Sequence, residues 1–277
     1  MKTIFASAVT LGVLAISAPA MAQDRDAHFD GPYVQAFGGY SFQNNDRRDT
    51  LVFDTDQDGS FDNNVLTTAP ANAFSPGFCN GNANGATPAA GCRPDRDGAE
   101  YGLRVGFDKR MGNFVVGALV EGAKSNAKDR TSGFSTTPAS YTVQRELDYN
   151  VALRARAGFT PGGGALFYGT GGIAYAKIDH DFQTTNTANS FDIVRGNKAT
   201  WGWQAGGGAE VMLTQNVSLG LEYLFNRYND DKAYVLVGQG TAPATNPFLL
   251  NSGATRLRGA HADFDYHSVR ASIGFSF

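Results

Sequence analysis

The sequence predicts an all-β fold: an eight-stranded antiparallel up-and-down transmembrane β-barrel with four long external loops and short periplasmic turns. Three observations predict it. Apolar and polar residues alternate with a period of two over eight segments, tight and long spacers alternate between those segments, and the charged residues of the segments stand opposite the apolar ones. This alternation is typical of strands whose successive side chains face lipid and lumen in turn.

The chain opens with a segment that has the features of an export signal. Lys2 supplies a positive start, a short apolar run follows, and Ala20-Met21-Ala22 places small residues at the positions that a signal peptidase reads. We therefore expect residues 1–22 to be a cleaved signal peptide and residues 23–277 to form the barrel domain. Export would place Cys79 and Cys92 in an oxidising compartment, where we expect them to form a local disulfide.

The eight alternating segments follow one another along the exported chain. In the second, Tyr101, Leu103 and Val105 alternate with glycine and Arg104, and in the last, apolar positions alternate up to Phe277. The first and fifth segments are rich in glycine, so their facing is ambiguous. The segments lie at 33–42, 101–108, 114–121, 149–159, 166–178, 201–213, 217–226 and 269–277.

The spacers between these segments are alternately long and short. Tight spacers lie at 110–113, 161–164 and 214–216, and long polar spacers lie at 43–98, 124–144, 179–198 and 229–263. In outer-membrane barrels the short turns face the periplasm and the long loops face outward. We therefore expect 43–98 to be a long first external loop.

An inverted barrel, with its apolar face toward lipid and its polar face toward a narrow lumen, explains the 34 glycines, because long inward side chains need small neighbours. We expect the inward charges to pair and cross-link the barrel wall, since an unpaired charge there is costly. A lumen closed by salt bridges and a small gated pore are both compatible with this pattern. The inward charges are Arg104, Asp108, Glu121, Arg154, Arg156, Glu210, Glu222 and Arg270.

The two ends of the exported chain carry a family resemblance. The last strand, SVRASIGFSF (268–277), ends on phenylalanine after alternating apolar positions, and GPYVQAFGGY (31–40) lies near the start. Together they resemble the small Gram-negative outer-membrane β-barrel family, the OmpA-like barrel domain of porin-like surface proteins. The resemblance implies Phe275 and Phe277 as the signal read by the barrel-assembly machinery, and contact with outer-membrane lipids and lipopolysaccharide. Because the barrel ends at residue 277, we expect no peptidoglycan-binding domain after it.

The first long spacer contains an acidic repeat. Asp54, Asp56, Asp58 and Asp62 follow the spacing D-x-D-x-D-G with a further Asp at position nine, which gathers carboxylates around calcium. Position twelve is Val65 instead of a bidentate Glu, and no helical pattern flanks the loop, so it is not an EF-hand. A lone calcium loop and a solvated acidic loop are the two interpretations. We expect no other cofactor.

Composition and motifs exclude several functions. A net charge of −3 gives no basic footprint for nucleic acid, and the exported part has no apolar run of about 20 residues for a membrane helix. His180 and His267 have carboxylate neighbours but no nucleophile motif, so we expect no enzyme.

The sequence instead predicts a structural and surface-interactive protein. A small-solute channel, and an adhesin that acts through the first external loop, are the alternatives.

Overall fold

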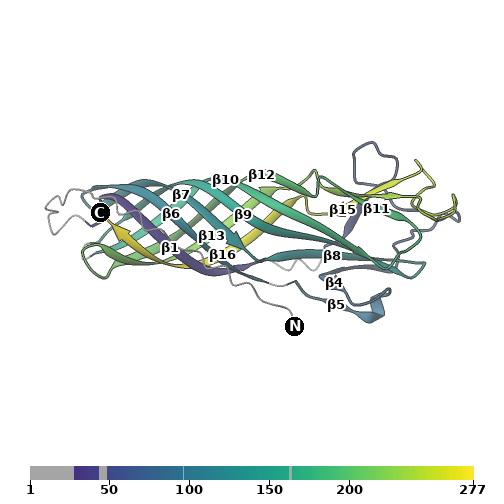
Figure 1. Ribbon diagram of the computed structural model, residues 1–277, viewed down its shortest axis with the longest axis horizontal. Helices are drawn as coiled ribbons and strands as arrows, with labels where there is room; N and C mark the ends of the chain where they lie inside the picture. Colours follow the sequence, from purple (N-terminus) through teal and green to yellow (C-terminus); the bar gives the residue numbers. More distant parts are fainter. Residues whose placement is uncertain (1–27, 44–48, 96, 162–163) are drawn as a thin grey trace, which may run out of the picture.

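The computed structural model describes residues 28–43, 49–95, 97–161 and 164–277. The signal peptide expected at 1–22 lies outside these residues and stays a prediction. The molecule is elongated, with the C-terminus at one end of a barrel and a second group of strands beyond the barrel's other end (Figure 1). None of the helical structure in the described chain is long and apolar enough to cross a membrane.

Eight of the described strands close into one antiparallel barrel, which confirms the predicted fold class. Their order around the barrel is β1-β6-β7-β9-β10-β12-β13-β16, and β16 returns to β1 with Tyr33 opposite Ser276. Closure pairs every strand of the wall on both sides, as a membrane-spanning sheet requires. The strands are β1 (Gly31–Phe42), β6 (Gly98–Met111), β7 (Phe114–Ser125), β9 (Ala139–Phe159), β10 (Ala165–Thr184), β12 (Asn197–Met212), β13 (Val217–Asn229) and β16 (Asp263–Ser276).

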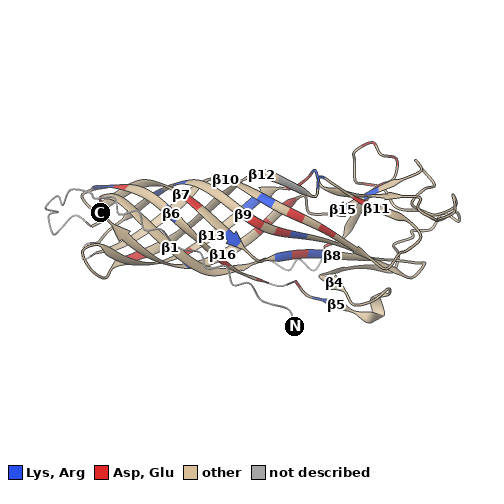
Figure 2. Ribbon diagram, in the orientation of Figure 1, with Lys and Arg blue, Asp and Glu red and all other residues tan. Residues whose placement is uncertain are grey.

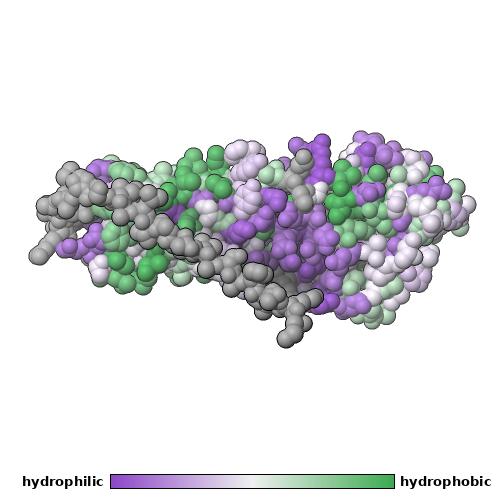
Figure 3. Space-filling view, in the orientation of Figure 1, coloured by the Kyte–Doolittle hydropathy of each residue, from purple (hydrophilic) through white to green (hydrophobic). Residues whose placement is uncertain are grey.

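Burial alternates along these strands in the way the hydropathy predicts. On β7, Phe114 is 62% exposed whereas Val115 is 1% exposed. Exposed apolar side chains lie on the outward face of all the barrel strands, and on the face drawn in Figure 3 hydrophobic patches on the barrel border a hydrophilic region in the middle of the molecule. Aromatic rings mark both edges of this band, as at membrane interfaces. The outer edge carries Tyr101, Tyr149, Tyr175 and Trp201, and the edge nearer the C-terminus carries Phe107, Phe114, Phe159, Phe167, Phe275 and Phe277.

Glycine lets the strands curve around a narrow lumen. Gly172 faces inward on β10, and a Cβ added there would collide with the carbonyl oxygen of Leu153 and lie 2.6 Å from Cα of Arg154. Gly122 faces outward on β7, and a Cβ there would meet nothing within 4 Å. Backbone crowding on the inner surface therefore requires glycine at position 172, whereas packing does not require it at position 122.

The barrel strands continue beyond the alternating segments, and the prediction of long polar loops was wrong in this respect. β9 begins at Ala139 and β10 ends at Thr184, so both enter spacers predicted as loops. β8 (Lys128–Ser135) pairs with the outer part of β9. Outside a membrane both faces of a strand can be polar, so the period-two signal fades although the strand continues.

The remaining external segments fold over the outer end of the barrel. A separate sheet has the order β11-β14-β15-β2 and lies over a core in which the rings of Phe53 and Phe74 are 4.4 Å apart. This core draws side chains from all four long spacers, including Tyr141, Phe191 and Phe248. We call these external segments, residues 49–95, 128–147, 178–196 and 229–263, the external cap. Its strands outside the barrel wall are β2 (Leu51–Asp54), β3 (Gly77–Asn80), β4 (Asn82–Ala83), β5 (Cys92–Arg93), β8, β11 (Ser190–Val194), β14 (Tyr234–Gly238) and β15 (Thr255–Gly259), with the short 3-10 helix η1 (Pro88–Ala90).

Candidate functional site

Guanidinium and carboxylate groups meet in the middle of the barrel. Arg154 on β9 donates to Glu121 on β7 at 2.6 Å and to Glu222 on β13 at 3.1 Å. Each carboxylate also serves a second arginine, because Arg270 on β16 donates to Glu121 at 2.6 Å and Arg104 on β6 donates to Glu222 at 2.9 Å. Three arginines and two carboxylates therefore bridge five strands of the wall.

A second group of charges lies nearer the barrel end that holds the C-terminus. Arg156 on β9 forms a two-point pair with Asp108 on β6, in which Nε lies 2.8 Å from Oδ1, and it donates to Glu210 on β12 at 3.0 Å. Gln35 on β1 joins the two groups. Its amide nitrogen donates to Glu210 at 2.7 Å, and its oxygen accepts from Nε of Arg104 at 2.5 Å.

The structure thus places all eight charged residues named from the sequence in the lumen. Besides the hydroxyls of Ser272 and Thr170, which accept from Arg104 and Arg154, it adds three larger partners that the sequence analysis missed. Gln35 is one, Tyr168 on β10 donates to Glu222 at 3.0 Å, and Glu100 accepts from Arg270. We call these eleven side chains the lumen network; they come from all eight barrel strands. From the sequence, the four inward arginines and four inward carboxylates are expected to balance. Among the described residues of the network, Glu100 makes five carboxylates against four arginines, so the expected balance was wrong.

The missed residues had different signals in the sequence. Glu100 lies one position before Tyr101, where the alternating segment was taken to begin, and extending the same period by one step places it inward. Gln35 and Tyr168 lie in the two glycine-rich segments whose facing was ambiguous. The signal for Glu100 was therefore present, whereas the facing of the other two depended on the folded barrel.

Packed side chains keep water away from the lumen network. The ionised side chains of Arg154 and Glu121 are 0% exposed, and those of Arg156 and Glu210 are 2% and 3% exposed. Aromatic rings pack against the network: the Arg156 guanidinium carbon lies 4.4 Å from the ring centre of Tyr33, a favourable cation–π distance. Apolar clusters lie on either side along the barrel. One is Phe29, Val115, Leu166 and Tyr168, and the other is Leu147, Ala152, Ala174, Ala176, Ile178, Tyr228, Phe264 and Tyr266.

Arg145 is the centre of a second ionic cluster, at the outer end of the barrel. It pairs with Asp129 on β8 and lies 3.6 Å from Asp230, which in turn lies 2.8 Å from Nε2 of His180. Burial opposes the charged guanidinium, yet Asp129 and Asp230 raise the pKa of Arg145 above its ordinary value. Burial and the nearby charge of Asp129 raise the pKa of Asp95 to about 7. This cluster connects residues of the cap with the barrel rim. Charged residues along β8 and β9 are visible in Figure 2.

The two histidines considered for catalysis lie in different contacts. Nδ1 of His180 lies 2.7 Å from the carbonyl oxygen of Gly196, while Nδ1 of His267 lies 2.6 Å from the hydroxyl of Tyr223. Within the described chain, neither ring is hydrogen-bonded to a serine or cysteine side chain. Among the described residues, neither histidine is therefore paired with a serine or cysteine nucleophile of the kind used in acyl transfer.

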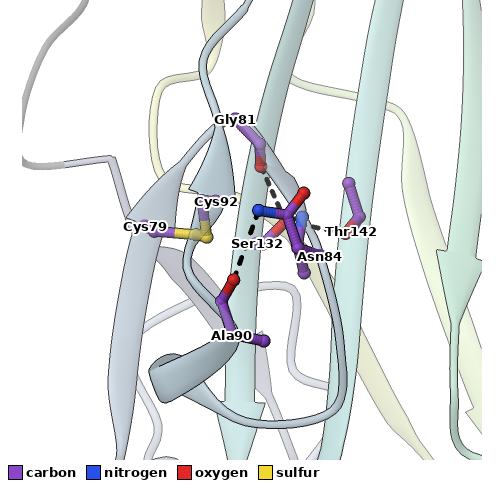
Figure 4. The surroundings of a disulfide bond; sticks show 8 residues. Cys79, Gly81, Asn84, Ala90, Cys92, Ser132 and Thr142 are labelled. Carbon is purple, nitrogen blue, oxygen red and sulfur yellow. Dashed lines mark hydrogen bonds between the residues drawn. A yellow bond between two sulfur atoms is a disulfide. The ribbon is translucent and has the colours of Figure 1, made fainter.

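A disulfide closes a small hairpin in the first external loop. Cys79 and Cys92 are bonded, with Cα atoms 6.4 Å apart (Figure 4). Beside the disulfide, the hydroxyl of Ser132 on β8 donates to the carbonyl oxygen of Gly81 at 2.7 Å and lies 2.7 Å from the hydroxyl of Thr142 on β9. The hairpin is therefore attached to strands that continue from the barrel wall.

The four aspartates of the acidic repeat do not all meet. Asp54, Asp56 and Asp58 bring carboxylate oxygens within 4.8 Å of one another at the end of β2. Asp62 lies outside this set and accepts from the side-chain amide of Asn63 at 3.2 Å.

The two terminal phenylalanines lie on the outer surface of the barrel, Phe275 on β16 and Phe277 directly after it. Phe275 and Phe277 are 43% and 45% exposed, with ring centres 5.1 Å apart. Because β16 pairs with β1 on one side and β13 on the other, both rings lie beside the seam that closes the barrel.

The sequence is similar to known outer-membrane proteins. The family model described as outer membrane protein beta-barrel domain matches residues 8–277. The 31 kDa outer-membrane immunogenic protein of Brucella melitensis biotype 1 is 26% identical over 184 residues, which cover 64% of this chain and 65% of that protein. The 22 kDa outer membrane protein of Rhizobium leguminosarum bv. viciae is 25% identical over 166 residues, covering 60% of this chain and 62% of that protein. Each match thus spans less than two thirds of the relative's length.

Solved structures agree at the level of the fold. The crystal structure of the outer membrane protein OprG from Pseudomonas aeruginosa matches with a TM-score of 0.51 at 13% identity, covering 92% of this chain and 100% of that one. At this identity the likeness concerns the fold alone.

Replacing Arg154 with methionine tests the lumen network. The substitution keeps much of the side-chain volume but leaves Glu121 and Glu222 short of a cation, so we expect the free energy of unfolding to fall by about 3–5 kcal/mol. Urea unfolding of the refolded barrel, followed by its shift in gel mobility, measures this change. As the control, Arg227→Met removes an exposed arginine paired with Asp265 and should cost less than about 1 kcal/mol. Equal losses in the two variants would contradict a special role for the buried network.

Proposed function

The chain belongs to the outer membrane protein beta-barrel domain family, and from this premise we propose that it acts as a closed structural barrel that supports the outer membrane and presents the external cap at the cell surface. The burial of the lumen network carries the proposal. A water-filled pore would leave the side chains along its wall accessible to solvent, whereas these ionised groups are at most about 3% exposed. The lumen network therefore favours a barrel that does not conduct.

Planar-bilayer recording tests whether the lumen is closed. We expect the refolded protein, inserted at a density that gives clear steps with a general porin, to produce no stable conductance steps. The same sample is checked for intact barrel by its gel mobility before and after boiling, so that a silent bilayer reports a closed barrel instead of an unfolded one. Stable nanosiemens steps would contradict the closed barrel and support the alternative, a small-solute channel.

The external cap supports the surface-interactive part of the proposal. It extends the molecule well beyond the apolar band and has its own packed core, so it holds a defined shape outside the membrane. A relative is named as an outer-membrane immunogenic protein, which supports exposure of such a cap to the surroundings.

An adhesin that acts through the first external loop is the second candidate. The disulfide-closed hairpin favours it, because Pro88, Ala89 and Ala90 at its tip are exposed while its base is attached to β8. Shortening the segment between the cysteines, with both cysteines retained, should leave the binding of protein-bearing vesicles to cell-coated plates unchanged if the role is structural. Loss of binding in this variant alone, and not after an equal shortening of residues 240–246, would favour the adhesin.

The outer rim of the apolar band offers a site for lipid phosphates. Lys124 on β7 and Lys177 on β10 point outward there, beside Tyr149, and both reach Asp148, at 3.4 Å and 3.0 Å. Lys177 also lies 3.4 Å from Asp179, so the two lysines face two carboxylates, and Lys124, whose side chain is 56% exposed, is the more accessible cation. An outward cation beside interfacial aromatic rings is suited to the phosphates of lipopolysaccharide.

At the other edge, Phe275 and Phe277 are proposed as the signal for the barrel-assembly machinery.

Neutralising both rim lysines tests the contact with lipopolysaccharide. We expect Lys124→Gln combined with Lys177→Gln to weaken binding of purified lipopolysaccharide to the barrel in nanodiscs by about fivefold or more, because each basic residue at a membrane surface contributes about 1 kcal/mol. Lys109→Gln is the control, since Lys109 is exposed and paired with Asp30 at the opposite end of the barrel. Unchanged affinity in the double variant would contradict this assignment.

A further inference from the structure

We propose that the acidic loop after β2 is a calcium site of the external cap, with Asp54, Asp56 and Asp58 as its carboxylate ligands. One carboxylate oxygen from each residue lies within 4.8 Å of the others. Ligand oxygens on opposite sides of a calcium ion, each at about 2.4 Å, lie up to about 4.8 Å apart. The three groups are therefore close enough to hold one ion without a large movement of the loop.

Asp54 provides an independent reason to place a cation here. Its side chain is 0% exposed, and its Oδ2 accepts from the backbone amide of Gly59 and from Arg256, both at 3.1 Å. Its Oδ1 is buried and has no hydrogen-bond donor among the described residues. A buried carboxylate oxygen without a partner is costly. The bonds to Oδ2 fix the carboxylate while Oδ1 stays available to a ligand, and Asp56 and Asp58 supply the neighbouring oxygens.

The charges at the loop also suit a divalent ion. The three carboxylates carry three negative charges, and the one guanidinium in contact with them, that of Arg256, reduces the local charge to minus two. Hard cations such as calcium prefer oxygen ligands, and calcium accepts irregular coordination that includes water. Asp56 and Asp58 are exposed, so an ion held here would keep water ligands on its outer side.

The site differs from an EF-hand in its remaining positions. Asp62, at position nine, lies outside the cluster, and Val65, at position twelve, is 1% exposed within the core of the cap. A site without the bidentate Glu belongs with weak extracellular calcium modules, for which dissociation constants of about 0.1–1 mM are typical.

Calcium at this position would connect two external loops. Thr55 accepts from the amide of Asn251 at 3.2 Å through its hydroxyl and from the hydroxyl of Ser252 at 2.6 Å through its carbonyl, and Gln57 donates to the Ser252 hydroxyl at 3.0 Å. These contacts hold the acidic loop against the last external loop. An ion that fixes the acidic loop would therefore also stabilise the packing between the two.

Isothermal titration of the refolded barrel with calcium chloride, in an uncharged detergent, tests the site. We expect saturable binding of one ion, with at least a tenfold loss of affinity in Asp58→Asn. Asp62→Asn is the matched control in the same loop and should stay within about twofold of the unchanged protein, because its carboxylate lies outside the cluster. Both residues are exposed, so neither substitution disturbs the packed core of the cap.

Two results would overturn the proposal. One is the absence of saturable heat up to about 10 mM calcium, roughly tenfold above the weak end of the expected range. The other is an equal loss of affinity in Asp58→Asn and Asp62→Asn, which would indicate diffuse attraction to an acidic surface. Limited proteolysis gives a second readout: calcium should slow cleavage within 54–62 in the unchanged protein and leave the rate for Asp58→Asn unaltered.

Discussion

Charged side chains enclosed in a narrow lumen need partners, and this constraint organises the barrel. An isolated ion inside a low-dielectric wall loses its hydration free energy and gains no equal interaction with the protein. Each buried guanidinium must therefore face carboxylates on other strands. Arg154 illustrates the result, because its two carboxylate acceptors come from β7 and β13, and each of these carboxylates also accepts from another arginine. Satisfying one side chain thereby fixes the relative positions of several strands.

The same constraint links the fold to the proposed function. The outward face of the barrel meets lipid, whose tails are as apolar as the side chains they touch, so burial of apolar area contributes less there than in water. Backbone ladders join neighbouring strands, and paired charges across the lumen add specific links between strands that are not neighbours, as between β9 and β13. Under the proposed function, the interactions that stabilise the barrel would also close it, and contact with the surroundings would be made by the rim and the external cap.

The barrel could be predicted from the sequence more fully than the cap, for a physical reason. Lipid on one side and a polar lumen on the other impose a period of two, and that period identified the eight strands and the eight lumen charges. Beyond the membrane edge the constraint ends: Thr142, Gln144 and Glu146 lie on a continuing strand that the hydropathy does not reveal. The cap core, in which Phe53, Tyr141 and Phe248 meet from three different spacers, depends on tertiary contacts between distant loops. In the acidic repeat, spacing grouped four aspartates, whereas the folded loop brings three together.

A double-mutant cycle at Arg156 and Asp108 tests most directly whether the buried charges hold the barrel together. The pair joins β9 and β6 through two contacts and is almost wholly buried. Unfolding free energies of the unchanged protein, Arg156→Met, Asp108→Asn and the double variant give the coupling between the two side chains. A coupling of about 2 kcal/mol or more is predicted, as measured for close charge pairs shielded from water. A coupling below about 0.5 kcal/mol, the value typical of independent sites, would contradict it.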